Sequence, residues 1–249
     1  MTEAQKSQAM SIISLGTTKI VNNYSENALL LNSCFVAKNR YETLTETNGL
    51  STIRNIPTNL RLENEIDVQY SNSELVENYR NELPNIIFKN YIIVSVSNVD
   101  ATLEDLYEHL LKIYEANINE NEVERRIRNA WTNDGMLSYL IDPLKSNLQK
   151  PNGLETSFTE ALMRYSELRI LRHTLLHTNG KLSEKNKQKL ENYLNSTPDE
   201  RKNLALINSP LFNQDWQITL NINQILAIRR YLYDYLMYLF HSINERTVI

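Results

Sequence analysis

Residues that break helices are scarce in this chain. It contains 5 Gly and 6 Pro among 249 residues, and its apolar residues recur mostly three or four positions apart. Gly and Pro are the strongest local breakers of regular structure, and apolar residues at this spacing line one face of a helix. The sequence therefore predicts a mostly helical chain, long enough to bury a sizeable core.

Composition limits where the chain works and what it binds. Cys34 is the one cysteine, which excludes an internal disulfide, and Ala9–Leu15 is a poor signal peptide. No apolar run reaches transmembrane length, because Lys89 and Asn90 divide the run at residues 86–96. We therefore expect a cytoplasmic protein that does not enter a membrane. The net charge of -4 argues against indiscriminate coating of nucleic acid, but it is compatible with a local basic site.

We expect one main domain preceded by an extension. Residues 1–50 have the pattern of one or two helices, and residues 47–72 have the composition of a linker, with many Thr and Asn. The expected boundaries are 1–75 for the N-terminal helical extension with its linker and 76–249 for the main helical domain.

Further helices are expected along the main domain. Pro84 suits the first turn of a long helix that reaches about Ala116. Tyr231, Tyr235 and Tyr238 share a face of the last helix, which favours packing or a subunit contact over a platform for stacked bases. The other expected elements are helices at 122–129, 134–148, 183–194, just after Thr197 and at 222–243, and a short extended segment at 216–220.

One helix has clear signals at both ends. Ser157 and Glu160 match a capping box, in which each side chain bonds to the backbone of the other residue. Asn179 and Gly180 tolerate the left-handed turn that commonly ends a helix. The helix should therefore begin after Ser157 and end just after His177.

Arg172 and His177, near the end of that helix, pair a permanent cation with a titratable imidazole. Such a pair can hold a phosphate and move a proton, which suffices to cleave RNA through its own 2′-hydroxyl without a metal. Residues five apart on a helix are separated by about 140° and about 7.5 Å. The two side chains converge on one phosphate only if the helix end unwinds or if two copies of the helix face each other, and the second arrangement predicts a twofold dimer.

Positive charge surrounds this pair. Seven Lys and Arg residues stand against three Glu between residues 160 and 189. Charge runs of this kind are commonly only solvated helix faces, but next to Arg172 and His177 they suggest contacts to an RNA backbone. The expected RNA-binding residues are Arg164, Arg169, Lys181 and Lys185.

Other readings of the same residues stay open. Arg172 could bond to a carboxylate or to helix-end carbonyls, while His177 caps its own helix. His173 and His177 form an HxxxH pair, but no third ligand is evident nearby, so no metal is expected. The sequence has no Gly-rich phosphate loop, no GxSxG elbow and no spaced set of cysteines, which disfavours nucleotide-hydrolase, serine-hydrolase and zinc-finger functions.

The segment from Arg172 to His177 resembles the motif of the HEPN superfamily, in its bacterial RiboL-PSP-like nuclease branch. That motif has Arg, a polar residue, three further residues and His at a helix end. The resemblance implies an antiparallel all-α helical bundle of HEPN type that dimerises and acts as a metal-independent endoribonuclease without a cofactor. It carries over Arg172 and His177 as the catalytic pair, with His173, Asp100 and Asn179 as accessory residues.

The resemblance covers roughly residues 80–245 and leads to three hypotheses. The first is an RNA-cleaving toxin or antiviral defence effector with a site shared across a homodimer. The second is a non-catalytic HEPN-like module that binds RNA, nucleotides or a partner. The third is a subunit of a larger complex, in which the extension docks an antitoxin or regulatory protein.

Overall fold

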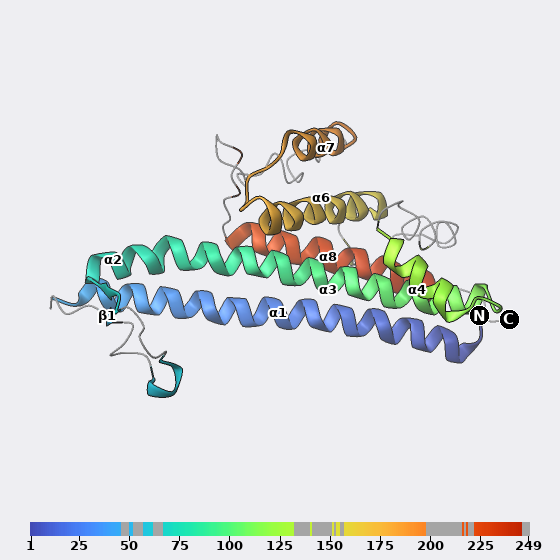
Figure 1. The fold of residues 1–249 in the computed structure, drawn as a ribbon, viewed down its shortest axis with the longest axis horizontal. Coiled ribbons are helices and arrows are strands. Elements are labelled where there is room, and N and C mark those ends of the chain that lie inside the picture. Colours follow the sequence, from blue (N-terminus) through green and yellow to red (C-terminus); the bar gives the residue numbers. More distant parts are fainter. Residues whose placement is uncertain are drawn as a thin grey trace. The chain divides into compact units, whose positions relative to one another are not determined.

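The computed structural model describes residues 1–45, 50–51, 57–61, 67–131, 140, 151, 153–154, 157–197, 216, 218 and 222–245. Most of these residues are helical (Figure 1), so the all-α prediction is confirmed. The helices are α1 (Glu3–Thr43), α2 (Asn72–Glu77), α3 (Leu83–Tyr114), α4 (Glu120–Asn129), α6 (Phe158–His177), α7 (Glu184–Asn195) and α8 (Ile222–Asn244). The shorter elements are strands β1 (Leu50–Ser51) and β2 (Gln69–Tyr70), a 3₁₀ turn (Thr58–Leu60) and a π-helical segment (Asn78–Glu82).

Several expected helices occur close to their predicted positions. One long helix, α1, occupies most of the region in which one or two helices were expected, and the helices expected at 122–129, 183–194 and 222–243 correspond to α4, α7 and α8. The helices expected at 134–148 and after Thr197 lie, apart from Leu140 itself, outside the described residues.

The start of the long helix differs from the expectation. α2, the π-helical segment and α3 follow one another without a break, so Pro84 lies inside a continuous helical stretch. Proline lacks the N–H of a normal helical bond and its ring meets the carbonyl one turn earlier. The wider π turn, which bonds five residues back, accommodates both effects. The helical stretch begins instead at Ser71, which forms a capping box with Glu74.

The chain divides into two compact units. The first combines residues 1–24 with 91–249, and the second consists of residues 25–90. The two units therefore do not divide at residue 75, where the boundary was expected. Helices α1 and α3 each contribute residues to both units.

The N-terminal part of α1 belongs to the larger unit because it packs closely on α3. Ala9, Ile13 and Ile20 are fully buried along one face of α1. Gly16 lies on the same part of the helix, and a Cβ at this position would stand 2.2 Å from Thr102 Oγ1. The two helices can thus approach at this point only because residue 16 has no side chain.

Hydrogen bonds join the same two helices. The Asn23 side-chain amide donates to the Ser95 hydroxyl over 2.7 Å, and a ring nitrogen of His109 lies 2.8 Å from the Gln5 carbonyl oxygen. The description of residues 1–75 as an extension is therefore corrected for its first 24 residues, which form part of the larger unit.

The second unit contains the short strands. β1 and β2 pair antiparallel, with Leu50 opposite Tyr70. The rings of Tyr41 and Tyr79 stack with centroids 5.9 Å apart. The expected linker thus contains some regular structure.

The core beside α6 is aromatic. α6 packs against α8 and also contacts α7 (Figure 1). Tyr165 of α6 stacks on Tyr235 of α8 with ring centroids 4.7 Å apart, and Phe158 meets Tyr238 edge-on at 5.5 Å. Tyr231, Tyr235 and Tyr238 are all buried. Their role in packing is therefore confirmed.

Candidate functional site

Both ends of α6 are as predicted. The Ser157 hydroxyl accepts a hydrogen bond from the backbone N–H of Glu160. At the other end the N–H groups of Thr178 and Gly180 both donate to the Thr174 carbonyl. Asn179 and Gly180 have φ angles of 50° and 82°, in the left-handed region that ends helices.

The turn after α6 is held by hydrogen bonds to Trp216 and Ile218, which lie far along the chain. The N–H of Ile218 donates to the Gly180 carbonyl over 3.0 Å, and the N–H of Leu182 donates to the Trp216 carbonyl over 3.1 Å. Of the residues expected to be extended at 216–220, Ile218 forms a β-bridge, whereas Trp216 has a φ angle of 58°, in the left-handed region. These bonds fix the loop that joins α6 to α7.

The guanidinium of Arg172 is directed to α3. Its Nε donates to the Ser97 hydroxyl over 2.9 Å, and its Nη1 donates to Asp100 Oδ2 over 3.3 Å. Arg169, one turn earlier on α6, places its Nε 3.3 Å from Asp100 Oδ1. Asp100 therefore holds two arginines of α6, and the Tyr165 hydroxyl donates to the same carboxylate.

Burial dominates the electrostatics of Asp100. The side chain is 11% exposed, and burial raises the pKa of its carboxyl, while the Tyr165 hydrogen bond and the two arginines act in the opposite direction. The pKa of Tyr165 is raised well above its usual value by burial and by the nearby Asp100 charge. Tyr165 thus keeps its proton and remains a donor to Asp100.

Trp131 also supports Arg169. The guanidinium carbon of Arg169 lies 3.6 Å from the centroid of the Trp131 ring, within the range of a cation–π interaction. The indole N–H of Trp131 donates to the Glu104 carboxylate. Arg169 therefore contacts both an aromatic face and the Asp100 carboxylate.

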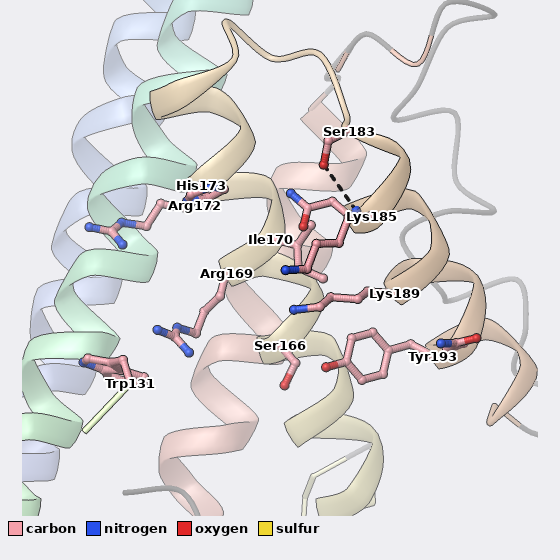
Figure 2. A pocket seen from close by; sticks show the side chains of 12 residues that line it. Trp131, Ser166, Arg169, Ile170, Arg172, His173, Ser183, Lys185, Lys189 and Tyr193 are labelled. Carbon is pink, nitrogen blue, oxygen red and sulfur yellow. Dashed lines mark hydrogen bonds between the residues drawn. The ribbon is translucent and has the colours of Figure 1, made fainter. Parts of the chain in front are cut away.

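An open pocket of about 730 Å³ lies between α6 and α7. Arg169, Arg172, Lys185 and Lys189 contribute to its wall, and none of the described lining residues is Asp or Glu. Figure 2 shows Lys185 and Lys189 extending from α7 toward α6, while Arg169 points toward Trp131. A smaller pocket of about 360 Å³ shares Trp131 and both arginines with it and reaches Asp100. The pocket between α6 and α7 is called the basic pocket below.

The two histidines of α6 are exposed and adjacent. Their rings are separated by 4.5 Å between centroids. His173 lines the basic pocket, whereas His177, the last residue of α6, is not among its lining residues. The part of the chain that the structure describes contains no group of three His, Cys, Asp or Glu side chains arranged to hold a metal.

The structure brings some of the predicted site residues together and separates others. Arg172, His173, Arg169 and Lys185 share the basic pocket, and Asp100 joins them through its ion pairs. Asn179 and Lys181 are exposed in the turn after α6 and do not appear in the pocket wall.

The expected role of Arg164 in RNA binding is wrong. Its side chain is fully buried, with Nη1 3.0 Å from Glu167 Oε2 and Nη2 donating to the Thr197 hydroxyl. A buried arginine that is paired inside the protein cannot contact a nucleic-acid backbone. The Glu167 three residues later was the local signal for such a pair.

The pocket also contains residues that the motif did not indicate. Lys189 could have been found from its spacing, because it lies one turn after Lys185 on the same helix. Trp131 and Ser97 had no comparable signal, since each meets α6 from another part of the chain.

Comparison with family models, with curated proteins and with solved structures gives no match. None of the described helices has the length and apolar character that crossing a bilayer requires.

Proposed function

We propose that the exposed end of α6 binds RNA and cleaves it as a metal-independent endoribonuclease of HEPN type. The observation that carries this proposal is the arrangement around Arg172. Ser97 and Asp100 fix its guanidinium at the edge of the basic pocket, which His173 also lines and which has no carboxylate among its described lining residues.

Arg172 is suited to binding a phosphate at the reacting centre. Its Nε and Nη1 donate to Ser97 and Asp100, and among the described residues its Nη2 has no acceptor. A guanidinium that is fixed through Nε and Nη1 leaves Nη2 to donate to a phosphate oxygen with little loss of entropy. It would stabilise the charge that builds up on the phosphorus during attack by the 2′-hydroxyl.

His177 supplies the proton transfer in this proposal. An exposed imidazole can take a proton from the 2′-hydroxyl or give one to the leaving oxygen. His173 lies next to it, with ring centroids 4.5 Å apart, and serves as the accessory polar residue. The chemistry needs no metal and leaves a 2′,3′-cyclic phosphate, which DNA cannot form.

The site is proposed to be shared between two copies of the chain. Within one chain the Arg172 guanidinium is bound to α3, whereas His177 occupies the exposed C-terminal end of α6. A twofold dimer that brings two α6 ends together would place Arg172 of one copy near His177 of the other. A nuclease of this kind would act as a toxin or antiviral defence effector under the control of an antitoxin or regulatory protein.

The proposal is tested with purified protein, freed of any inhibitor, and single-stranded RNA in the presence of EDTA. The wild type should produce 2′,3′-cyclic phosphate ends and should leave 2′-deoxy substrates intact. Arg172→Ala and His177→Ala should each lower the cleavage rate by at least about 100-fold, the usual scale of a lost proton-transfer or charge-stabilising group.

Matched controls are Arg40→Ala on α1 and His241→Ala on α8, which remove the same residue types outside the basic pocket. Both should cleave like the wild type. The proposal is wrong if no RNA is cut, if EDTA stops the reaction, or if His177→Ala keeps full activity.

A second candidate is an RNA-binding module without catalysis. The contact that favours it is the ion pair between Arg172 and the buried Asp100, because an arginine with a purely structural role would make the same contact. The exposure of His177 favours the nuclease instead. If RNA binding persists without cleavage and His177→Ala leaves the affinity unchanged, the binding module is the correct function.

A further inference from the structure

We propose that the basic pocket binds a compact ligand with two or three adjacent phosphates, such as inorganic tripolyphosphate or the triphosphate of a nucleotide. This inference goes beyond the proposed function, because it needs neither RNA cleavage nor a second copy of the chain.

The number and placement of the cations indicate more than one anionic group. Arg169 and Arg172 lie one turn apart on α6, and Lys185 and Lys189 lie one turn apart on α7. All four line the same pocket, and Figure 2 shows the two lysines extending from α7 toward α6. A single phosphate can neutralise one such pair, whereas two pairs on separate helices match a chain of linked phosphates.

The arginine pair and the lysine pair differ in how far carboxylates of the protein already neutralise their charge. Asp100 forms ion pairs with both arginines and offsets one of their two charges. Lys185 and Lys189 form no ion pair or hydrogen bond with any described residue. Their side chains are exposed, so the pocket carries an excess of positive charge that an anionic ligand would neutralise.

A neutral donor and the size of the pocket also fit such a ligand. Tyr193 lines the pocket from α7, and Figure 2 shows its hydroxyl directed toward α6. The volume of about 730 Å³ lies within the usual range of pockets for small molecules. It accommodates a tripolyphosphate or a mononucleotide.

The test is calorimetric titration of the full chain at fixed ionic strength with orthophosphate, pyrophosphate, tripolyphosphate and ATP. Tripolyphosphate should bind one site per chain, at least roughly tenfold more tightly than orthophosphate. Lys185→Gln/Lys189→Gln should weaken its binding by roughly tenfold or more at an unchanged melting temperature. Tighter binding of ATP than of tripolyphosphate would identify a nucleotide as the ligand, and equal binding would identify the inorganic chain.

Lys19→Gln/Arg40→Gln is the matched control, because it removes two exposed charges from α1 outside the pocket. It should bind tripolyphosphate like the wild type. The proposal is overturned if tripolyphosphate does not saturate a site, if both double variants behave alike, or if orthophosphate binds equally well. It is also overturned if single-stranded RNA binds through Lys185 and Lys189 while tripolyphosphate and ATP do not, because the pocket would then be part of a strand-binding surface. None of these outcomes depends on whether the protein cleaves RNA.

Discussion

At the scale of single residues, Asp100 organises the site. It lies on α3, largely buried, and receives Arg169, Arg172 and the Tyr165 hydroxyl from α6. Removing one partner of a buried ion pair leaves the other charge buried and unpaired. This loss of stability exceeds what the intact pair contributes. The position of Arg172 in the proposed reaction therefore depends on a residue that need not contact the RNA.

The raised pKa of Asp100 predicts a pH dependence of stability. Because burial raises the carboxyl pKa in the folded state, the unfolded chain releases this proton at lower pH than the folded protein does. The contribution of Asp100 to the free energy of unfolding should therefore fall as the pH rises from the ordinary Asp range to the folded pKa, and stay constant above it.

Urea unfolding of the wild type and Asp100→Asn across the acidic range measures this effect. The difference in free energy of unfolding, wild type minus variant, should decline with rising pH. Asp105→Asn, at an exposed position on the same helix, serves as the control for charge removal alone. A difference that increases with pH would show that the arginines outweigh burial and lower the pKa.

At the scale of elements, the local signals were sufficient for α6 and insufficient for α3. Ser157 and Asn179-Gly180 are adjacent in sequence to the helix ends that they determine, so both ends could be predicted. Pro84 by itself predicts a first turn, because proline suits that position, and the π-helical segment before it has no recognised sequence signal. A proline is compatible with the first turn of a helix, and also with its interior when the turn before it is a wider π turn.

The close contact between α1 and α3 predicts the effect of a single methyl group. Gly16→Ala should destabilise the protein by about 1–3 kcal/mol, because the new Cβ would stand 2.2 Å from Thr102 Oγ1 and 2.9 Å from Thr102 Cβ. The better helix propensity of Ala offsets about 1 kcal/mol of the strain. Thermal unfolding measures the loss, expected as a fall of a few degrees in the melting temperature.

Thr102→Ala in the Gly16→Ala background is the second half of this test. Removing Thr102 Oγ1 and Cγ2 takes away two of the three close atoms, so it should recover part of the lost stability. A Gly16→Ala protein as stable as the wild type would contradict the close approach of the two helices.

At the scale of the whole molecule, the helical class could be predicted but the division into units could not. The scarcity of Gly and Pro, with the helical spacing of apolar residues, was enough for the class. The grouping of residues 1–24 with 91–249 depends on contacts between residues far apart in sequence, such as Asn23 with Ser95. The spacing of residues along the sequence does not show which distant residues are in contact.

The candidate site shows the same limit. Arg172, His173 and Lys185 were identified from local spacing and charge, and they do share the basic pocket. Arg164 has the same charge but faces the interior beside Glu167, and Trp131 reaches the pocket from outside α6 and α7. The direction in which a charged side chain points is decided by packing, which the sequence shows only indirectly.

The central claim is that Arg172 of one copy and His177 of another act on the same phosphate. Arg172→Ala and His177→Ala proteins, each inactive alone, can be unfolded together, refolded as a mixture and assayed on single-stranded RNA. Random pairing gives half mixed dimers, each with one complete site out of two, so activity should return to about a quarter of the wild-type rate. If the wild type is active and the mixture is no more active than either variant alone, the shared site is contradicted.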